Sequence, residues 1–349
     1  MKVTVVGPFP PPVHGSSKNL LAITEEIEVL VDVKRISISP STLNRDVKYH
    51  CNKYLKVVKG LFQLFITKQD RVYTTADAGF GMFYTLLFIL IVKLKRIDLV
   101  IHHRSFAYID KKNNLMKILY KLTKNNCHVF LCSCMKDKYE ILYGKVKDVL
   151  IVSNAKQVEP ATSIKVRKDS LKLGYLSNLT KEKGFDIFLD VFEKLMVDGV
   201  DVEILIAGPA SDSDSKTRLN KVLKKYSNVK YFGPVFGVDK IKFFSSLDVF
   251  VFPTDYKNEA QPNVLFEAMA YGNVILSTNK GCISSDISSK TGMVTDVSDF
   301  KDKAVLFLTA LASNNELLAE LKNNSLAEIK SKKKISIDGH DALIRRLTN

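Results

Sequence analysis

The sequence predicts an α/β fold with two parallel sheets, each covered by helices on both faces. Short apolar, β-branched runs alternate with longer helical patterns along most of the 349 residues. Strands that are apolar throughout, rather than at every second position, are typical of parallel sheets buried on both faces. The expected strands are 2–6, 71–75, 98–103, 128–133 and 148–153 in a first series, and 171–177, 201–208, 228–233, 247–253 and 273–278 in a second.

Two such series predict two doubly wound domains, and a chain of this length suits two domains better than one. The pattern restarts after VEPATS, so we expect an N-terminal domain over 1–155 and a C-terminal domain over 168–330. Residues 331–349 are expected to form a helix that packs back toward the N-terminal domain. Ligands of such sheets lie beyond the carboxyl ends of the strands. Candidate functional residues are therefore sought in the loops that follow strands.

The net charge of +15 is concentrated in the first half of the chain. Residues 1–160 hold 25 Lys and Arg against 13 Asp and Glu, whereas the remainder holds 27 against 24. A basic half indicates an anionic partner, such as a phosphorylated substrate, an anionic membrane surface or nucleic acid. No nucleic-acid-binding motif and no Trp is present, so nucleic acid is not the expected partner.

No metal site and no membrane-spanning helix are expected. The five cysteines form no pair of CxxC motifs, and no other metal-like cluster is evident. The N-terminus, MKVTVVGPFPPP, passes directly into a strand pattern and lacks the character of a cleavable signal. The most apolar run, Phe80–Val92, has 13 residues, fewer than the roughly 20 that a spanning helix needs. We expect a cytoplasmic protein in which this run is a buried or interfacial helix.

Two post-strand loops of the N-terminal half carry candidate ligand-binding groups. His14, Gly15 and Ser16 lie where a helix begins, and the free N–H groups there suit an anionic oxygen. The alternative is a Pro-rich turn with a Ser cap. His102 and His103 end another strand, where reactive groups collect. The alternative is a histidine pair in the core or on the surface, and metal ligation is disfavoured because adjacent strand residues point to opposite faces.

A first loop of the C-terminal half, SNLTKEKGFDIF, places Lys181 and Lys183 between a strand and a helix. A lysine in such a loop is a suitable point charge for a diphosphate. Gly184 allows the backbone to approach a ligand closely. The pattern KEKG also occurs in ordinary surface sequence, so by itself it is weakly specific.

A second loop contains two glutamates eight positions apart, in NEAQPNVLFEAMAYGNVILST. Glu259 lies in the loop after a strand, and the helix begins near Gln261-Pro262, where proline is tolerated. Glu267 lies about two turns into that helix, on the face that also carries Asn263. Because VLFEAMA is apolar, a solvated surface role for Glu267 is not expected. We predict that one ligand lies across both carboxylates, with sugar hydroxyls at Glu259 and a ribose at Glu267.

These motifs, taken together, resemble the retaining glycosyltransferases of family four, which have the GT-B architecture of two facing Rossmann-like domains with a cleft between them. The E-x7-E element of that family is similar to Glu259 through Glu267. Its G-R-L-x-x-x-K-G element is similar to Ser177-Asn178-Leu179 followed by Lys183-Gly184. The segments AGP, YFGPV, SLDVFVFP and TNKG also match in kind and order. The resemblance covers nearly the whole chain and is strongest over 171–295.

The resemblance implies a metal-independent hexosyltransferase without a cofactor, whose donor substrate is a nucleoside diphosphate sugar. It implies that Glu267 binds the ribose, Glu259 the donor sugar and Lys183 the diphosphate, and that His103 lies beside the sugar as an active-site residue, with His102 as the fallback. The further donor-binding residues that it implies are His14, Gly15, Ser16, Asn178, Gly184, Gly233, Pro234, Val235, Ala260, Gln261 and Asn263.

One position departs from the family pattern. Asn178 stands where the family usually has an arginine, which removes a positive charge from the diphosphate site. Two alternatives remain open beside sugar transfer. One is a nucleotide-sugar epimerase, which shares the architecture, and the other, suggested by Asn178, is a paralogue that binds sugar nucleotides without catalysis.

The expected acceptor is a saccharide or a lipid-linked saccharide in the assembly of bacterial surface polysaccharide or glycolipid. Residues 45–71 hold seven Lys and Arg and two Asp, with apolar residues between the basic ones. A basic amphipathic segment of this kind lies well on an anionic bilayer. The expected partners are thus the donor, the acceptor and an anionic membrane surface, with the protein peripheral on the inner face of the plasma membrane. The alternative for this segment is the solvated face of an ordinary helix.

Overall fold

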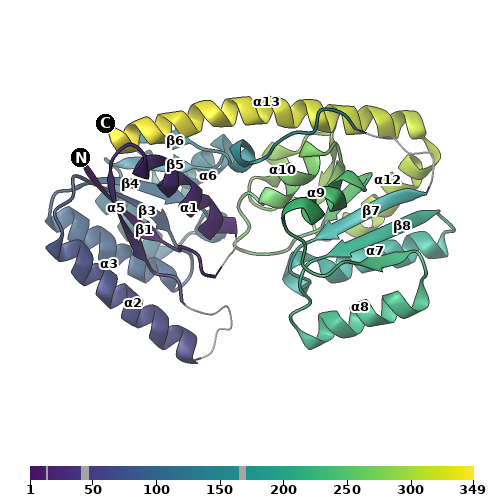
Figure 1. The fold of residues 1–349 in the computed structure, drawn as a ribbon, viewed down its shortest axis with the longest axis horizontal. Coiled ribbons are helices and arrows are strands. Elements are labelled where there is room, and N and C mark those ends of the chain that lie inside the picture. The colour runs from purple at the N-terminus through teal and green to yellow at the C-terminus, as the bar shows by residue number, and fades with distance from the viewer. Residues whose placement is uncertain (13–14, 41–46, 165–169) are drawn as a thin grey trace. The chain divides into compact units, whose positions relative to one another are not determined.

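The computed structural model describes residues 1–12, 15–40, 47–164 and 170–349, and the chain folds as two compact units (Figure 1). The first unit consists of Met1–Asn154 together with Ser336–Asn349, and the second consists of Ala155–Ile335. The helix expected over 331–349 is the last part of α13 (Asn315–Thr348), whose residues from Ser336 onward belong to the first unit. His14 lies outside the described residues.

The first unit is built on a six-stranded parallel sheet with the order β2-β1-β3-β4-β5-β6. Its strands are β1 (Lys2–Gly7), β2 (Asp32–Ser37), β3 (Arg71–Ala76), β4 (Asp98–His103), β5 (Cys127–Phe130) and β6 (Asp148–Ile151). Its helices are α1 (Gly15–Glu28), α2 (Val47–Ile66), α3 (Gly81–Leu94), α4 (Ala107–Asp110), α5 (Asn114–Thr123) and α6 (Ser133–Tyr143). The short 3-10 helix η1 (Asn154–Gln157) begins at the last residue of this segment and continues into the second unit.

The core of the first unit lies between this sheet and helices packed on it. One cluster joins the strands to α1 and to the end of α13, through buried residues such as Val5, Leu20, Val100 and Leu343. The end of α13 is also held by polar contacts. Ser336 Oγ donates to the Ser153 carbonyl over 2.6 Å.

The second unit is built on another six-stranded parallel sheet, with the order β12-β11-β10-β7-β8-β9. Its strands are β7 (Leu171–Leu176), β8 (Val202–Ala207), β9 (Val229–Tyr231), β10 (Val249–Phe252), β11 (Val274–Thr278) and β12 (Gly292–Thr295). Its helices are η2 (Lys181–Lys183), α7 (Phe185–Val197), α8 (Ser213–Lys225), α9 (Gly237–Ser245), α10 (Asn263–Ala270), α11 (Ile283–Asp286), α12 (Phe300–Ser313) and the first part of α13.

Both faces of the second sheet are covered, as its apolar strands require. One buried cluster joins the sheet to α7, α8 and α12, with Phe188, Leu219 and Leu308 among its members. The other joins it to α9, α10 and α11, with Phe244 and Leu265 among its members. The expected α/β class with two helix-covered parallel sheets is confirmed.

Two strands escape the sequence prediction, and both lie at sheet edges. Each pairs with one neighbour. Asp32–Ser37 (β2) carries Asp, Lys, Arg and Ser, which mask the strand pattern, whereas Gly292–Thr295 (β12) is only four residues long and begins with glycine. The strand expected over 128–133 is also wrong at its end. It stops at Phe130, and α6 begins at Ser133.

Candidate functional site

The candidate site lies where the strand order of the second sheet reverses. From β7 the chain proceeds to β8 and β9 on one side of the sheet, then returns to β10, β11 and β12 on the other. The carboxyl ends of β7 and β10 are therefore neighbours, and their loops diverge to leave room for a ligand. Lys183 follows β7 and Glu259 follows β10. They are 76 residues apart in the sequence, yet Lys183 Nζ lies 2.7 Å from Glu259 Oε2.

This ion pair is largely shielded from water. The Lys183 side chain is 21% exposed and that of Glu259 is 10% exposed. Thr254 Oγ1 lies 3.3 Å from the same carboxylate oxygen. The Lys183 ammonium lies 4.3 Å from the ring centroid of Tyr256, which places a cation over an aromatic face. A cation and a carboxylate held together at a loop edge offer one group for a phosphate and one for hydroxyls.

Glycine at 184 lets the β7 loop approach the β10 loop. Gly184 has φ +78°, and a Cβ there would lie 1.9 Å from the Pro253 carbonyl oxygen. Any larger residue at position 184 would push the two loops apart. Glycine therefore allows Lys183 to lie close to the loop that carries Glu259.

Backbone hydrogen bonds join the loops at this edge into one continuous rim. Asp255 N donates to Glu182 O over 2.9 Å, between the loops after β10 and β7. Cys282 N donates to Ala260 O over 2.7 Å, between the loops after β11 and β10. Two further links, across β7, β8 and β9, are Leu179 N to Pro209 O over 3.0 Å and Gly208 N to Gly233 O over 2.8 Å.

Gln261 is oriented by a buried carboxyl group. Its Nε2 donates to both oxygens of Asp286, over 3.1 and 2.9 Å. Burial raises the pKa of Asp286 to about 7, although the hydrogen bond from Gln261 and the nearby Lys332 oppose that shift. Asp286 is thus a titratable group, next to the predicted site, whose charge changes near neutral pH.

The remaining predicted residues of the second unit lie on other elements of the same edge. Glu267 is on α10, where its Oε2 lies 2.5 Å from Lys240 Nζ of α9. Its side chain is 29% exposed, so the carboxylate is accessible although it is paired.

The other predicted residues lie in loops or at the start of a helix. Gly233, Pro234 and Val235 form the turn after β9, and Asn263 begins α10. Asn178 is exposed, as is Lys181, while Lys183 is half-buried.

In the first unit, β4 ends in His102 and His103, and the two rings have different surroundings. His103 is buried, and both of its ring nitrogens are engaged. Nδ1 lies 3.1 Å from Tyr108 Oη, and Nε2 lies 2.9 Å from His128 Nδ1. Its ring stacks on Phe130 with centroids 4.6 Å apart. Burial lowers the pKa of His103 well below its ordinary value, so this imidazole is neutral. Its role beside a sugar stays a prediction.

The ring of His102 is engaged at one nitrogen. Its Nδ1 lies 2.6 Å from Tyr73 Oη, whereas its Nε2 is buried and has no hydrogen-bond partner in the described part of the chain. Burial also lowers the pKa of His102 well below its ordinary value. Of the other predicted residues of this unit, Gly15 and Ser16 form the first turn of α1.

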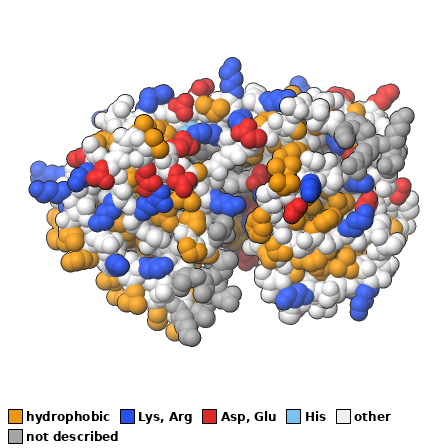
Figure 2. All heavy atoms as spheres, in the orientation of Figure 1, with side chains coloured by type: hydrophobic (Ala, Val, Ile, Leu, Met, Phe, Trp, Pro, Cys, Tyr) orange, Lys and Arg blue, Asp and Glu red, His pale blue; other side chains and the backbone are white. Residues whose placement is uncertain are grey.

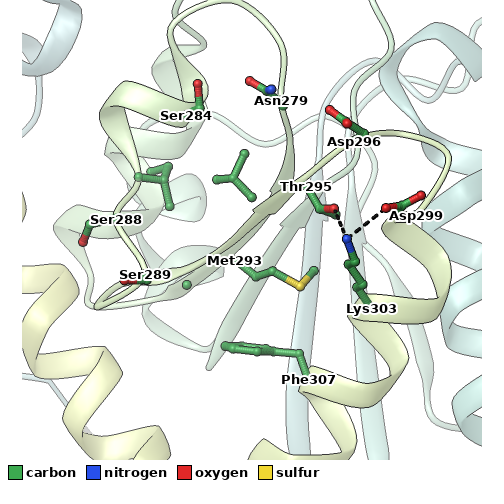
Figure 3. A pocket seen from close by; sticks show the side chains of 13 residues that line it. Asn279, Ser284, Ser288, Ser289, Met293, Thr295, Asp296, Asp299, Lys303 and Phe307 are labelled. Carbon is green, nitrogen blue, oxygen red and sulfur yellow. Dashed lines mark hydrogen bonds and ion pairs between the residues drawn. The ribbon is translucent and has the colours of Figure 1, made fainter.

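An open cavity of about 630 Å³ lies along the edge strand β12 (Figure 3). Lys303 lies at one side of it, with Nζ 2.9 Å from Asp299 Oδ2 and 3.3 Å from Thr295 Oγ1. Neither Lys183 nor Glu259 lines this cavity. It is therefore separate from the ion pair at the switch point.

Within the described ranges, no group of three or more His, Cys, Asp or Glu side chains is placed to hold a metal ion. In the same ranges, none of the helices combines the length and the hydropathy that a bilayer crossing requires.

Sequence reasoning missed Thr254, Tyr256, Lys240 and Asp286. Thr254 and Tyr256 follow β10 directly and thus carry the same positional signal as Glu259. Lys240 and Asp286 lie on helices, and nothing in the sequence connects them with the glutamate or the glutamine that they contact.

A family model matches most of the second unit. Residues 170–311 match the family model Glycosyl transferases group 1. The matched segment contains Lys183, Glu259 and Glu267. CapM of Staphylococcus aureus, a capsular polysaccharide biosynthesis glycosyltransferase, is 30% identical over 139 residues. That region is 39% of this chain and 36% of CapM, so the match spans about a third of the relative's length.

A longer match is to an uncharacterized glycosyltransferase of Haemophilus influenzae, 23% identical over 318 residues, which are 89% of this chain and 83% of the relative. Among solved structures, HepE of Anabaena in complex with UDP has a TM-score of 0.74 at 14% identity, covering 100% of both chains. Sucrose-phosphate synthase of Thermosynechococcus elongatus has a TM-score of 0.73 at 12% identity, covering 99% of this chain and 98% of the other. The expected GT-B fold class is confirmed.

Proposed function

We propose that this protein is a retaining glycosyltransferase of family four that moves a hexose from a nucleoside diphosphate sugar to an acceptor hydroxyl. The observation that carries the proposal is the Lys183–Glu259 pair at the switch point of the second sheet. Support comes from the family match over 170–311 and from the similar structure of HepE, which holds UDP and, in another crystal, UDP-glucose.

In this proposal the Lys183–Glu259 ion pair opens when the donor binds. The Lys183 ammonium then binds the diphosphate, and the Glu259 carboxylate accepts hydrogen bonds from hydroxyls of the donor sugar. Thr254, which already contacts Glu259, holds that carboxylate in place. The Glu267 carboxylate accepts hydrogen bonds from the ribose hydroxyls, and its ion pair with Lys240 is lost. No metal or cofactor has a part in the proposal.

The proposed chemistry is front-face displacement with retention at the anomeric carbon. The bond from the anomeric carbon to the diphosphate breaks as the acceptor oxygen bonds to the same face, and the departing phosphate accepts the acceptor's proton. The role of this chain is to stabilise the negative charge that develops on the diphosphate, through Lys183 and backbone N–H groups of the rim. Glu259 acts as a hydroxyl-binding group and not as the nucleophile of a double displacement.

The similarity to CapM supports an acceptor in surface-polysaccharide assembly, either a saccharide or a lipid-linked saccharide. The cytoplasmic location expected from the sequence stays a prediction.

The experiment that tests the proposal is a panel of nucleoside diphosphate sugars, scored by thermal shift and by slow hydrolysis of the donor. We expect one donor to raise the melting temperature of the wild type and of Lys181→Met, an exposed neighbour that serves as the matched control. Lys183→Met is expected to lose most of that shift. Equal shifts for both variants, or no shift with any donor, would contradict the assignment of Lys183.

One observation favours a second candidate, a sugar-nucleotide-binding protein without catalysis. Asn178 supplies no positive charge to the diphosphate site, and its side chain is exposed. Donor binding without hydrolysis or transfer to any acceptor would favour that candidate. Release of an epimerised sugar nucleotide would instead favour an epimerase.

A further inference from the structure

Helix α2 of the first unit has a second apolar face that no described residue covers. Its inner face is anchored on the sheet by Val57, Gly60 and Leu64, all of them buried. The approach there is close, because a Cβ on Gly60 would lie 2.7 Å from Ile36. Another stripe faces solvent, and it recurs at helical spacing. Its members are Tyr54, Leu55, Val58, Phe62, Phe65 and Ile66, with Phe62 63% exposed and Phe65 54% exposed.

Helix α3 packs against α2 and lies beside it (Figure 1). Its exposed apolar residues are Phe83, Leu90 and Leu94, preceded by Phe80 at the N-cap. Their spacing of three, seven and four positions places them on one outward stripe. Figure 2 shows hydrophobic side chains along the lower left edge of this view, where Figure 1 has α2 and α3.

The two helices are locked together at their C-terminal ends. Lys95, which follows α3, donates from Nζ to the carbonyl oxygens of Leu64, Phe65 and Thr67 over 3.1, 2.8 and 2.5 Å. A cation that caps the last carbonyls of α2 satisfies groups that the helix leaves open. The apolar stripes thus belong to a preformed surface, which we call the α2–α3 surface.

Its charges are almost all of one sign. Helices α2 and α3 together hold five Lys and no Asp or Glu. Asp77, in the chain between the two helices, pairs with Lys53 over 3.7 Å. Lys59, Lys68 and Arg96 are exposed. An apolar face with lysines and an arginine around it is complementary to anionic head groups over acyl chains.

We propose that the α2–α3 surface docks on an anionic lipid bilayer, with the aromatic and leucine side chains in the interface and Lys59, Lys68 and Arg96 against the head groups. A two-fold contact between copies of the chain fits less well, because it would set cations of one copy against the same cations of the other. The proposal does not rest on the transfer reaction, since vesicles without donor or acceptor suffice to test it.

The test is flotation of the full chain with vesicles of phosphatidylglycerol and phosphatidylcholine, compared with phosphatidylcholine alone, at low and high salt. We expect flotation with the anionic vesicles at low salt, weakened by salt and weak on neutral vesicles. Phe62→Ser/Phe65→Ser should lower the partition coefficient about tenfold or more, because two partly inserted rings are lost. Lys59→Glu/Lys68→Glu should lower it to a similar degree.

The matched control is Ile141→Ser, which removes an 83% exposed apolar side chain from α6 of the same unit and should leave flotation within about twofold. Thermal unfolding of each variant establishes that it folds. Absence of flotation with anionic vesicles at low salt overturns the proposal, as does flotation that the double variants leave unchanged. A concentration-dependent dimer that Phe62→Ser/Phe65→Ser abolishes would assign the surface to a second copy instead.

Discussion

The most specific physical prediction concerns Asp286, whose charge state links pH to the stability of the second unit. The carboxyl group is buried beside Gln261, and burial raises its pKa from 3.8 to about 7. The folded state therefore binds the proton more tightly than the unfolded state. The stability that Asp286 contributes is fully present below about pH 3.8 and is lost as pH rises through about 7.

The magnitude follows from the two pKa values. Between about pH 5 and pH 8, the difference in proton binding lowers the free energy of unfolding by roughly 2–3 kcal/mol. Asp286→Asn removes this titration while its side-chain oxygen still accepts a hydrogen bond from Gln261. The variant should therefore be less sensitive to pH than the wild type. Lys332 and Glu328, the neighbouring charges, stay in place in both proteins.

The assay is chemical denaturation of the wild type and Asp286→Asn at several pH values across this range. We expect the difference in unfolding free energy between them to change by roughly 2–3 kcal/mol in favour of the variant as pH rises. A difference that stays constant with pH would refute the reasoning, because it would mean that Asp286 titrates alike in the folded and unfolded chain.

Two further predictions concern the frame that holds the site. Gly184→Ala should cost about 2 kcal/mol or more, because its Cβ meets a carbonyl oxygen at 1.9 Å. Gly199→Ala, at φ +73° with open space around it, should cost about 1 kcal/mol, and equal losses would contradict the steric account. Lys322→Met should cost about 3–5 kcal/mol, because it strips a buried partner 2.7 Å away from Asp248. Lys332→Met, in a more exposed pair, should cost under about 1 kcal/mol, and denaturation midpoints that agree for both would contradict this ranking.

The sequence predicts the fold class because period and composition are local properties. Apolar strands alternating with helices give two parallel sheets, and the loops after strands give the candidate residues. The order of strands is not local. That β7 lies beside β10 decides that Lys183 meets Glu259, and only the folded sheet contains that information.

The surroundings of a side chain also cannot be predicted from sequence patterns when residues distant in the sequence form them. The two histidines at the end of β4 look equivalent in sequence. In the structure, His103 is enclosed by Tyr108 and His128, whereas Nε2 of His102 meets no hydrogen-bond partner among the described residues. The pairing of Glu267 with Lys240 joins two helices in the same way. In each case the partner is set by packing.

The most direct measurement is the turnover of Glu259→Gln beside Glu182→Gln, with the donor that the panel identifies. Glu182 is an exposed neighbour of Lys183, so it controls for the loss of one carboxylate from the same rim. With both variants folded, we expect Glu182→Gln to transfer sugar at nearly the wild-type rate and Glu259→Gln to be slower by about a hundredfold. Wild-type turnover in Glu259→Gln would contradict the claim that this carboxylate holds the donor sugar.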